Sequence, residues 1–110
     1  MDSRELYSAA KHLGILLNWE QDWIHFGTGP EINNDLIDDL INDFLKGEFI
    51  HFIHERMNSG TFKQPELSQK IKELLGKSNF ELWNESMDRA IQFNQIGVLL
   101  KGTKKTNTFE

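Results

Sequence analysis

Apolar residues recur three and four positions apart along most of this 110-residue chain, the spacing of amphipathic helices. The segment from about Ser3 to Trp19 shows this spacing first, and Asp2 with Glu5 fits an N-terminal cap for that helix. The run Gly27-Thr28-Gly29-Pro30 then interrupts the pattern, because glycine and proline favour loops. The N-terminal part of the chain is therefore predicted to be a helix that ends before this loop.

Two more helices are predicted on either side of Gly47. The first begins between Pro30 and Asn34 and runs to Lys46, and its apolar stripe consists of Leu36, Ile37, Leu40, Ile41, Phe44 and Leu45. After Gly47 the apolar positions change phase, so the stripe cannot continue straight on. We expect a break at Lys46-Gly47 and a third helix over Glu48–Met57.

The rest of the chain offers two further helices and one unassigned segment. Pro65 fits the first turn of a fourth helix that Gly76 closes, and Ser78 with Glu81 fits a capping box for a fifth. The inner face of the fifth helix would hold Phe80, Trp83, Met87 and Ala90 or Ile91. Residues 96–100 are short and apolar, and they fit a last helical turn, a packed extension or a strand.

These segments together predict an all-α fold, an irregular bundle of four to five short helices, with residues 95–110 left open. A chain of 110 residues has room for one hydrophobic core, and eight Phe and three Trp can fill it. We expect a single helical domain over residues 1–100 and a flexible tail over residues 101–110, which are rich in Thr and Lys.

Composition also excludes several classes of protein. The chain has no cysteine, so it cannot form disulfides or use thiolate chemistry. It contains no apolar run near the ~18 residues that a membrane span needs, and no secretory signal pattern. A cytoplasmic protein without a membrane partner is the expectation.

The charge of the chain is concentrated in one segment. Between Glu31 and Glu48 there are six acids and one base, Lys46, a local charge of −5 that equals the formal net charge of the chain. Such a surface attracts basic partners and repels phosphate backbones. The candidate partner-binding residues in this segment are Asp35, Asp38, Asp39 and Asp43.

A second group of polar residues suggests a metal or small-ligand site. On a helix, Glu48, His51 and Glu55 would project from one side, and Glu-x-x-His is a spacing that di-iron bundles use. The chain has no second Glu-x-x-His pair and no His-Glu-x-x-His. An exposed polar helix face is the favoured interpretation, so we expect no metal and no cofactor.

Catalysis and nucleic-acid binding have little support. No serine lies in a Gly-x-Ser-x-Gly elbow, and no catalytic residue can be named. The fourth and fifth helices could form a helix-turn-helix. The fifth, however, carries the acids Glu81, Glu85 and Asp88 where a DNA-reading helix needs Arg or Lys. A non-enzymatic protein that does not bind nucleic acid directly is the prediction.

The leading functional hypothesis is a protein-binding domain. It would act as an inhibitor or immunity-type protein and cover the basic surface of a partner such as a nucleic-acid enzyme. Trp23 is the candidate aromatic anchor, because Trp is enriched at binding hot spots. The alternatives are a helical metal- or small-ligand-binding domain that uses the Glu48–Glu55 face, and an interaction module of a larger assembly. Sequence leaves the partner's identity, the oligomeric state and the pathway open.

Overall fold

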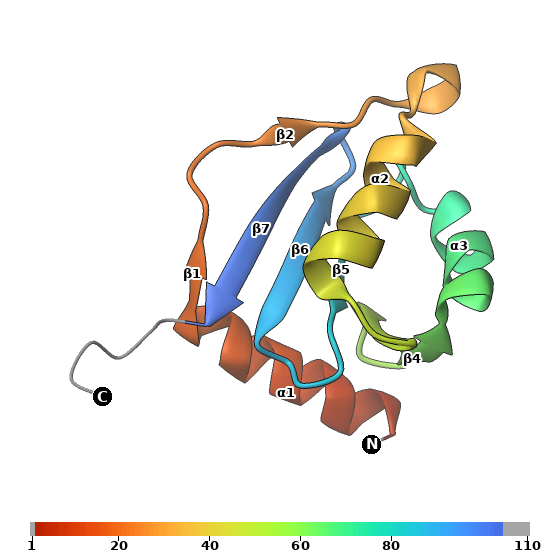
Figure 1. The fold of residues 1–110 in the computed structure, drawn as a ribbon. Helices are drawn as coiled ribbons and strands as arrows, with labels where there is room; N and C mark the ends of the chain where they lie inside the picture. Colours follow the sequence, from red (N-terminus) through yellow and green to blue (C-terminus); the bar gives the residue numbers. More distant parts are fainter. Residues whose placement is uncertain (1, 105–110) are drawn as a thin grey trace.

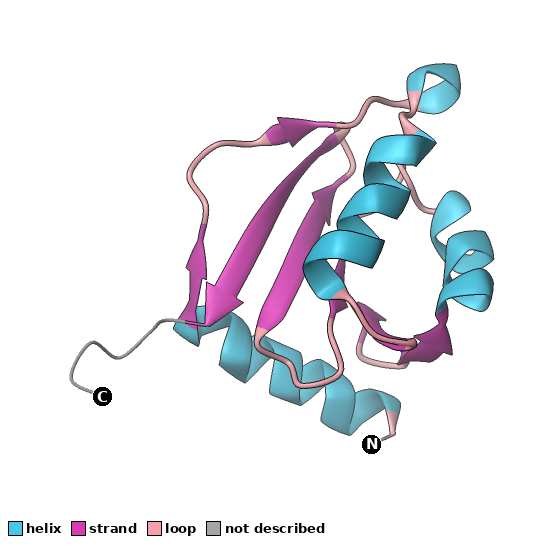
Figure 2. Cartoon of the chain, in the orientation of Figure 1, coloured by secondary structure: helices cyan, strands magenta, loops and turns pink. Residues whose placement is uncertain are grey.

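The computed structural model describes residues 2–104 and is an α+β fold around one antiparallel sheet (Figures 1 and 2). The elements in chain order are α1 (Ser3–Leu16), β1 (Leu17–Trp19), β2 (Ile24–His25), the 3₁₀ turn η1 (Gly29–Glu31), α2 (Asn34–Leu40), the π-helical turn η2 (Ile41–Leu45), β3 (Phe49–Glu55), β4 (Asn58–Lys63), α3 (Gln64–Lys72), β5 (Phe80–Trp83), β6 (Arg89–Asn94) and β7 (Val98–Lys104). The strand order is β1-β7-β6-β5-β3-β4, and β2 also pairs with β7.

Helices cover both faces of this sheet. In Figure 1, α2 lies in front of the strands with α3 beside it to the right, and α1 crosses behind the strands. Residues of α2, η2 and α3 pack with Phe52, Leu82 and Ile91 in the larger core cluster. The smaller cluster joins Leu6 and Ala10 of α1 to other sheet residues, including Ile53, Trp83 and Ala90. The central strands are therefore buried on both sides.

The prediction of an all-α fold is wrong. The segment expected as a third helix is β3, which pairs with β4 and β5. Phe52 and Ile53 are neighbours that point to opposite faces, and both are buried because both faces are covered. Two-sided burial removes the alternation of apolar and polar residues that marks a half-exposed strand. Apolar residues can then fall three or four positions apart by chance, which is the spacing expected of a helix.

The expected fifth helix is a hairpin of β5 and β6, so the structure contains no helix-turn-helix here. The turn is fixed by Asn84, whose Oδ1 accepts hydrogen bonds from the backbone N–H groups of Asp88 and Arg89, both at 3.0 Å. Asn and Asp favour such turns because their side chains bond the local backbone. Glu81 lies within β5 and does not cap a helix.

Several local predictions are confirmed. Helices begin near Ser3, after Asn33 and at Gln64, and Pro65 lies in the first turn of α3. The chain breaks at Lys46 and Gly47, where φ is 57° and 84°. Of the three alternatives for residues 96–100, the strand is right, because β7 begins at Val98. β7 runs to Lys104, so the expected tail overlaps it, and residues 105–110 lie outside the described part of the chain.

We expect substitution of Leu82 by Ala to lower the free energy of unfolding by about 2–5 kcal/mol, because its side chain is 0% exposed and a cavity would remain. The matched control is Leu16→Ala, since Leu16 is 53% exposed and should change stability by less than about 0.5 kcal/mol. Urea titration followed by tryptophan fluorescence measures both. Equal effects at the two positions would contradict the described burial of β5.

The Asn84 turn also predicts acid sensitivity. A hydrogen bond from Asn84 lowers the pKa of Asp88 below its ordinary value of 3.8, helped by a bond from Ser86. Stabilisation from this carboxylate is therefore full above pH 3.8 and is lost as the pH falls through the lowered pKa. In urea titrations at a series of acidic pH values, Asp88→Asn should lose less stability on acidification than wild type. Parallel pH profiles would contradict this role.

Candidate functional site

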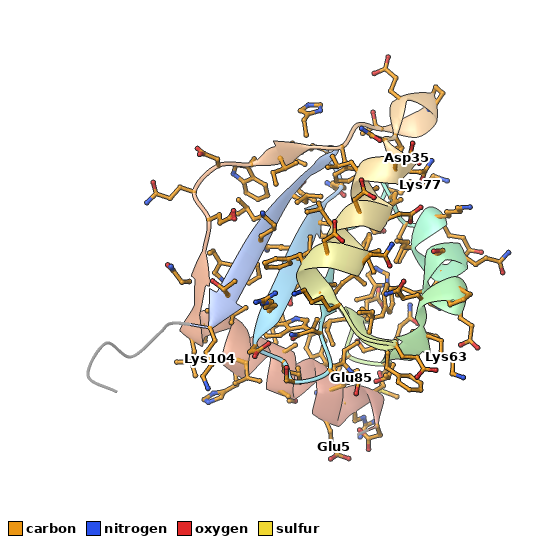
Figure 3. All side chains as sticks on the ribbon, viewed as in Figure 1. Glu5, Asp35, Lys63, Lys77, Glu85 and Lys104 are labelled. Atoms are coloured by element: carbon orange, nitrogen blue, oxygen red, sulfur yellow. The ribbon has the colours of Figure 1, made fainter. Side chains whose placement is uncertain are left out.

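Four exposed aspartates lie on the outside of α2 and η2. Asp35, Asp39 and Asp43 follow one another every four residues, so they form a stripe along one side of the helix. Ile37 and Ile41 lie on the buried side, in the larger core cluster. Figure 3 shows the Asp35 side chain at the end of the molecule opposite Glu5 of α1. We call the four residues Asp35, Asp38, Asp39 and Asp43 the acidic face.

Asp38 departs from the stripe and lies toward α3. It lines two cavities between the helices, of about 160 and 300 Å³. Polar side chains shared between α2 or η2 and α3 line them with it: Asn34, Asn42, Gln64, Ser68 and Lys72. The acidic face is thus a stripe of three carboxylates with a fourth at the edge of a shallow groove.

No base within the described residues forms an ion pair with the acidic face. The two ion pairs among the described residues join Lys63 to Glu48 at 3.7 Å and Lys101 to Glu20 at 3.5 Å, and neither includes one of the four aspartates. Arg89 lies beside η2, but its Nη1 donates to the carbonyl oxygen of Phe44 at 3.0 Å. The four carboxylates therefore face solvent without an ionic partner in residues 2–104.

The helix that holds these aspartates is fixed at both ends. Asn33 caps its start, because its Oδ1 accepts a hydrogen bond from the Leu36 N–H at 3.1 Å. At the other end the Lys46 N–H donates to the Ile41 carbonyl at 3.0 Å, which closes the π-helical turn. Arg89 places positive charge at the same carbonyl end, where the helix dipole favours it.

Trp23 comes from a different part of the molecule. It lies in the connection between β1 and β2, strands that both pair with β7, and its side chain is 49% exposed. An exposed Trp is available to a partner, as the hot-spot hypothesis requires. The structure places Trp23 at the β7 edge of the sheet, whereas the four aspartates lie on α2 and η2.

The alternative metal site required a helix that is absent. Glu48 precedes β3 and pairs with Lys63. His51 Nε2 lies 3.2 Å from the Glu85 carbonyl oxygen and Nδ1 lies 2.7 Å from Thr61 Oγ1, so both ring nitrogens have local partners. Among residues 2–104, no three His, Asp or Glu side chains gather in a way that could hold a metal ion.

Glu81 is one of the residues whose predicted environment is wrong. In β5 it is partly buried, and its carboxylate accepts a hydrogen bond from Trp83 Nε1 at 3.0 Å. Burial raises the pKa of Glu81, while the Trp83 bond and the charge of Lys11 lower it in part. The only signal in the sequence was the pattern Phe-Glu-Leu-Trp, which also fits a strand with one polar position.

Comparison with known proteins identifies no relative: no family model, no curated protein and no solved structure matches the chain. In the part of the chain that the structure describes, no helix combines the length and apolar character that crossing a bilayer requires.

The position of each aspartate along the helix predicts its effect on stability. Asp43→Asn should raise the free energy of unfolding by up to about 0.5 kcal/mol, because it removes repulsion from Asp39 and a negative charge near the carbonyl end. Asp35→Asn should not stabilise, because Asp35 lies in the first turn, where the dipole favours an acid. Chemical denaturation of both variants is the measurement. Destabilisation by Asp43→Asn would indicate that this carboxylate has a partner within the fold.

Proposed function

We propose that this protein is a non-enzymatic binding domain whose acidic face covers the basic surface of a protein partner. The supporting observation is the exposed stripe of Asp35, Asp39 and Asp43, without ionic partners in the described residues. Three like charges four residues apart repel one another and reduce helix stability slightly. The attraction of the three carboxylates to a basic partner would offset that repulsion.

The proposed mechanism has two stages. Long-range attraction between the acidic face and a basic surface raises the rate of encounter, and salt weakens it because the screening length is about 10 Å at 0.1 M. Close contact then covers the partner's basic residues. If those residues bind phosphates, as in a nucleic-acid enzyme, the complex inhibits the enzyme by occlusion. This is the activity of an inhibitor or immunity-type protein.

Trp23 is the proposed aromatic anchor, and its place at the β7 edge sets a requirement on the partner. One surface would have to reach from α2 around the edge of the sheet to touch both Trp23 and the aspartates. A large or concave partner meets this requirement more easily than a small flat one. Trp23→Ala should then increase the dissociation rate, whereas neutral aspartates should mainly decrease the association rate.

The test compares two variants with the same net charge. The first carries Asp35→Asn, Asp38→Asn, Asp39→Asn and Asp43→Asn. The second neutralises four exposed acids elsewhere: Asp22→Asn, Glu55→Gln, Glu66→Gln and Glu73→Gln. Affinity capture from the native cell, followed by mass spectrometry, should give a partner that wild type and the second variant retain and the first variant loses.

Kinetics with the captured partner then separate local charge from net charge. Association of wild type should slow as salt is added, and the first variant should associate at least roughly tenfold more slowly at low salt. The second variant should behave nearly as wild type. Association that depends equally on both sets of substitutions would reduce the effect to net charge. A partner indifferent to salt and to the first variant would remove the acidic face from the mechanism.

A further inference from the structure

The face of the sheet that carries α1 is only partly covered. α1 starts beside the β3–β4 turn, where Ser3 Oγ donates to the Arg56 carbonyl at 2.8 Å, and ends at β1 on the other side of the sheet. In Figure 1, β6 and β7 extend well beyond the helix toward the turn that joins them. On this extension Leu100 and Val98 of β7 are only partly buried.

Two hollows lie along the border between α1 and this open part of the sheet. One, of about 220 Å³, has among its lining residues Tyr7, Lys11, Ile53, Asn79, Glu81 and Gln92. The other, of about 210 Å³, is lined by Ala10, Lys11, Gly14, Ile15, Trp19, Glu81 and Gln92. Both contain Glu81, which comes from β5 on the floor, and Lys11, which comes from α1 on the wall. We call the two hollows together the Glu81 groove.

The strand register places the floor of this groove. Ile53, Glu81, Gln92 and Leu100 pair in turn across β3, β5, β6 and β7, so they form one row on the α1 face. This row offers one carboxylate and one amide between two apolar residues. A ligand that lies along it would meet a negative charge next to hydrophobic surface.

The Glu81 carboxylate has spare capacity to accept hydrogen bonds. Its Oε1 accepts the indole N–H of Trp83, and this is its only hydrogen bond or ion pair within the described residues. A carboxylate offers two oxygens with about four acceptor positions. Burial of a charge without a counter-ion is unfavourable, and the raised pKa of Glu81 reflects that burial. A donor cation in the groove would relieve this cost.

Lys11 fills that role only in part, through a longer-range attraction that lowers the pKa of Glu81. Its ammonium lies over the Tyr7 ring, 5.3 Å from the ring centre, and it forms no ion pair with Glu81. Lys11 is an exposed residue at the wall of the groove, so its side chain can move without disturbing the core. The position next to Glu81 is therefore open to a second cation.

We propose that the Glu81 groove binds a small organic cation, an ammonium or guanidinium group on a short apolar chain. Glu81 is the counter-ion, Gln92 and Asn79 offer amide groups at the rim, and Ile53 contacts the apolar chain. The larger hollow, of about 220 Å³, is smaller than the roughly 300 Å³ or more of pockets for drug-sized ligands, so the ligand is a small molecule. The groove lies on the opposite face of the sheet from the acidic face, so this proposal does not depend on the proposed function.

The indole N–H of Trp83 provides a direct readout, because it donates to the proposed counter-ion. We would titrate the isotope-labelled protein with n-butylamine and follow the three indole signals by NMR, assigned with Trp19→Phe and Trp23→Phe. The Trp83 signal should shift and saturate at millimolar amine. The Trp23 signal should stay in place, and 1-butanol, which lacks the charge, should produce no saturating shift.

Glu81→Gln separates a binding role from a structural one. Glutamine keeps an acceptor for the Trp83 indole, so the fold should persist, but the affinity for butylamine should fall roughly tenfold or more. Glu66→Gln, an exposed acid on α3, is the matched control and should bind as wild type. Lys11→Met should bind butylamine several-fold more tightly, because it removes a competing positive charge. Equal affinity in wild type and Glu81→Gln would overturn the proposal.

Two further binding measurements identify the source of the cation and distinguish the Glu81 groove from the acidic face. Binding of a blocked lysine amide without binding of butylamine would assign the groove to a protein lysine and overturn the small-molecule ligand. The variant with four neutral aspartates on the acidic face should bind butylamine as wild type does. Loss of butylamine binding in that variant would mean that net charge, and not the groove, attracts the amine, and it would overturn the proposal.

Discussion

Leu82 and Trp83 are adjacent residues of β5 that point to opposite faces of the sheet, and both are 0% exposed. Their burial requires apolar cover on both sides, and the chain provides it unequally. α2, η2 and α3 cover one face, while α1 covers the other together with Leu17, Trp19 and Met87. The outer side of α2 is left free to carry charge, and the sheet beside α1 is left partly open. Both candidate surfaces follow from this arrangement.

Two-sided burial also explains which elements the sequence could predict. The helices lie on the surface of the sheet, so each has one apolar stripe and a polar remainder, and their periodicity is clear. At their centres, β3 and β5 have no side that faces solvent, as Phe52 with Ile53 and Leu82 with Trp83 show. In β3, Ile50 and Ile53 lie three residues apart as they would on a helix, yet they contact different core clusters. Only the pairing partners, which are distant in sequence, separate these two possibilities.

The candidate sites differ in the same way. The exposure of Asp35, Asp39 and Asp43 could be predicted, because it depends only on the phase of one helix. The environment of Glu81 could not, because it depends on Gln92, Ile53 and Lys11, which come from three other elements. The capping-box pattern of Ser78 and Glu81 is local and has a physical basis. The pairing of residues 80–83 with β6 outweighs it.

The two negative surfaces act over different ranges because their surroundings differ. The aspartates are exposed, so water and salt weaken each charge to about 1 kcal/mol for a unit partner at 4 Å, and only their sum attracts a partner from a distance. Glu81 is a single partly buried charge, for which the effective dielectric constant is lower and the same contact is about fourfold stronger. It would exert little attraction beyond its groove, but in the proposed site it would discriminate strongly between a cation and a neutral molecule of the same shape. Charge on α2 therefore suits the recognition of a large surface, and charge on β5 suits the selection of a small ligand.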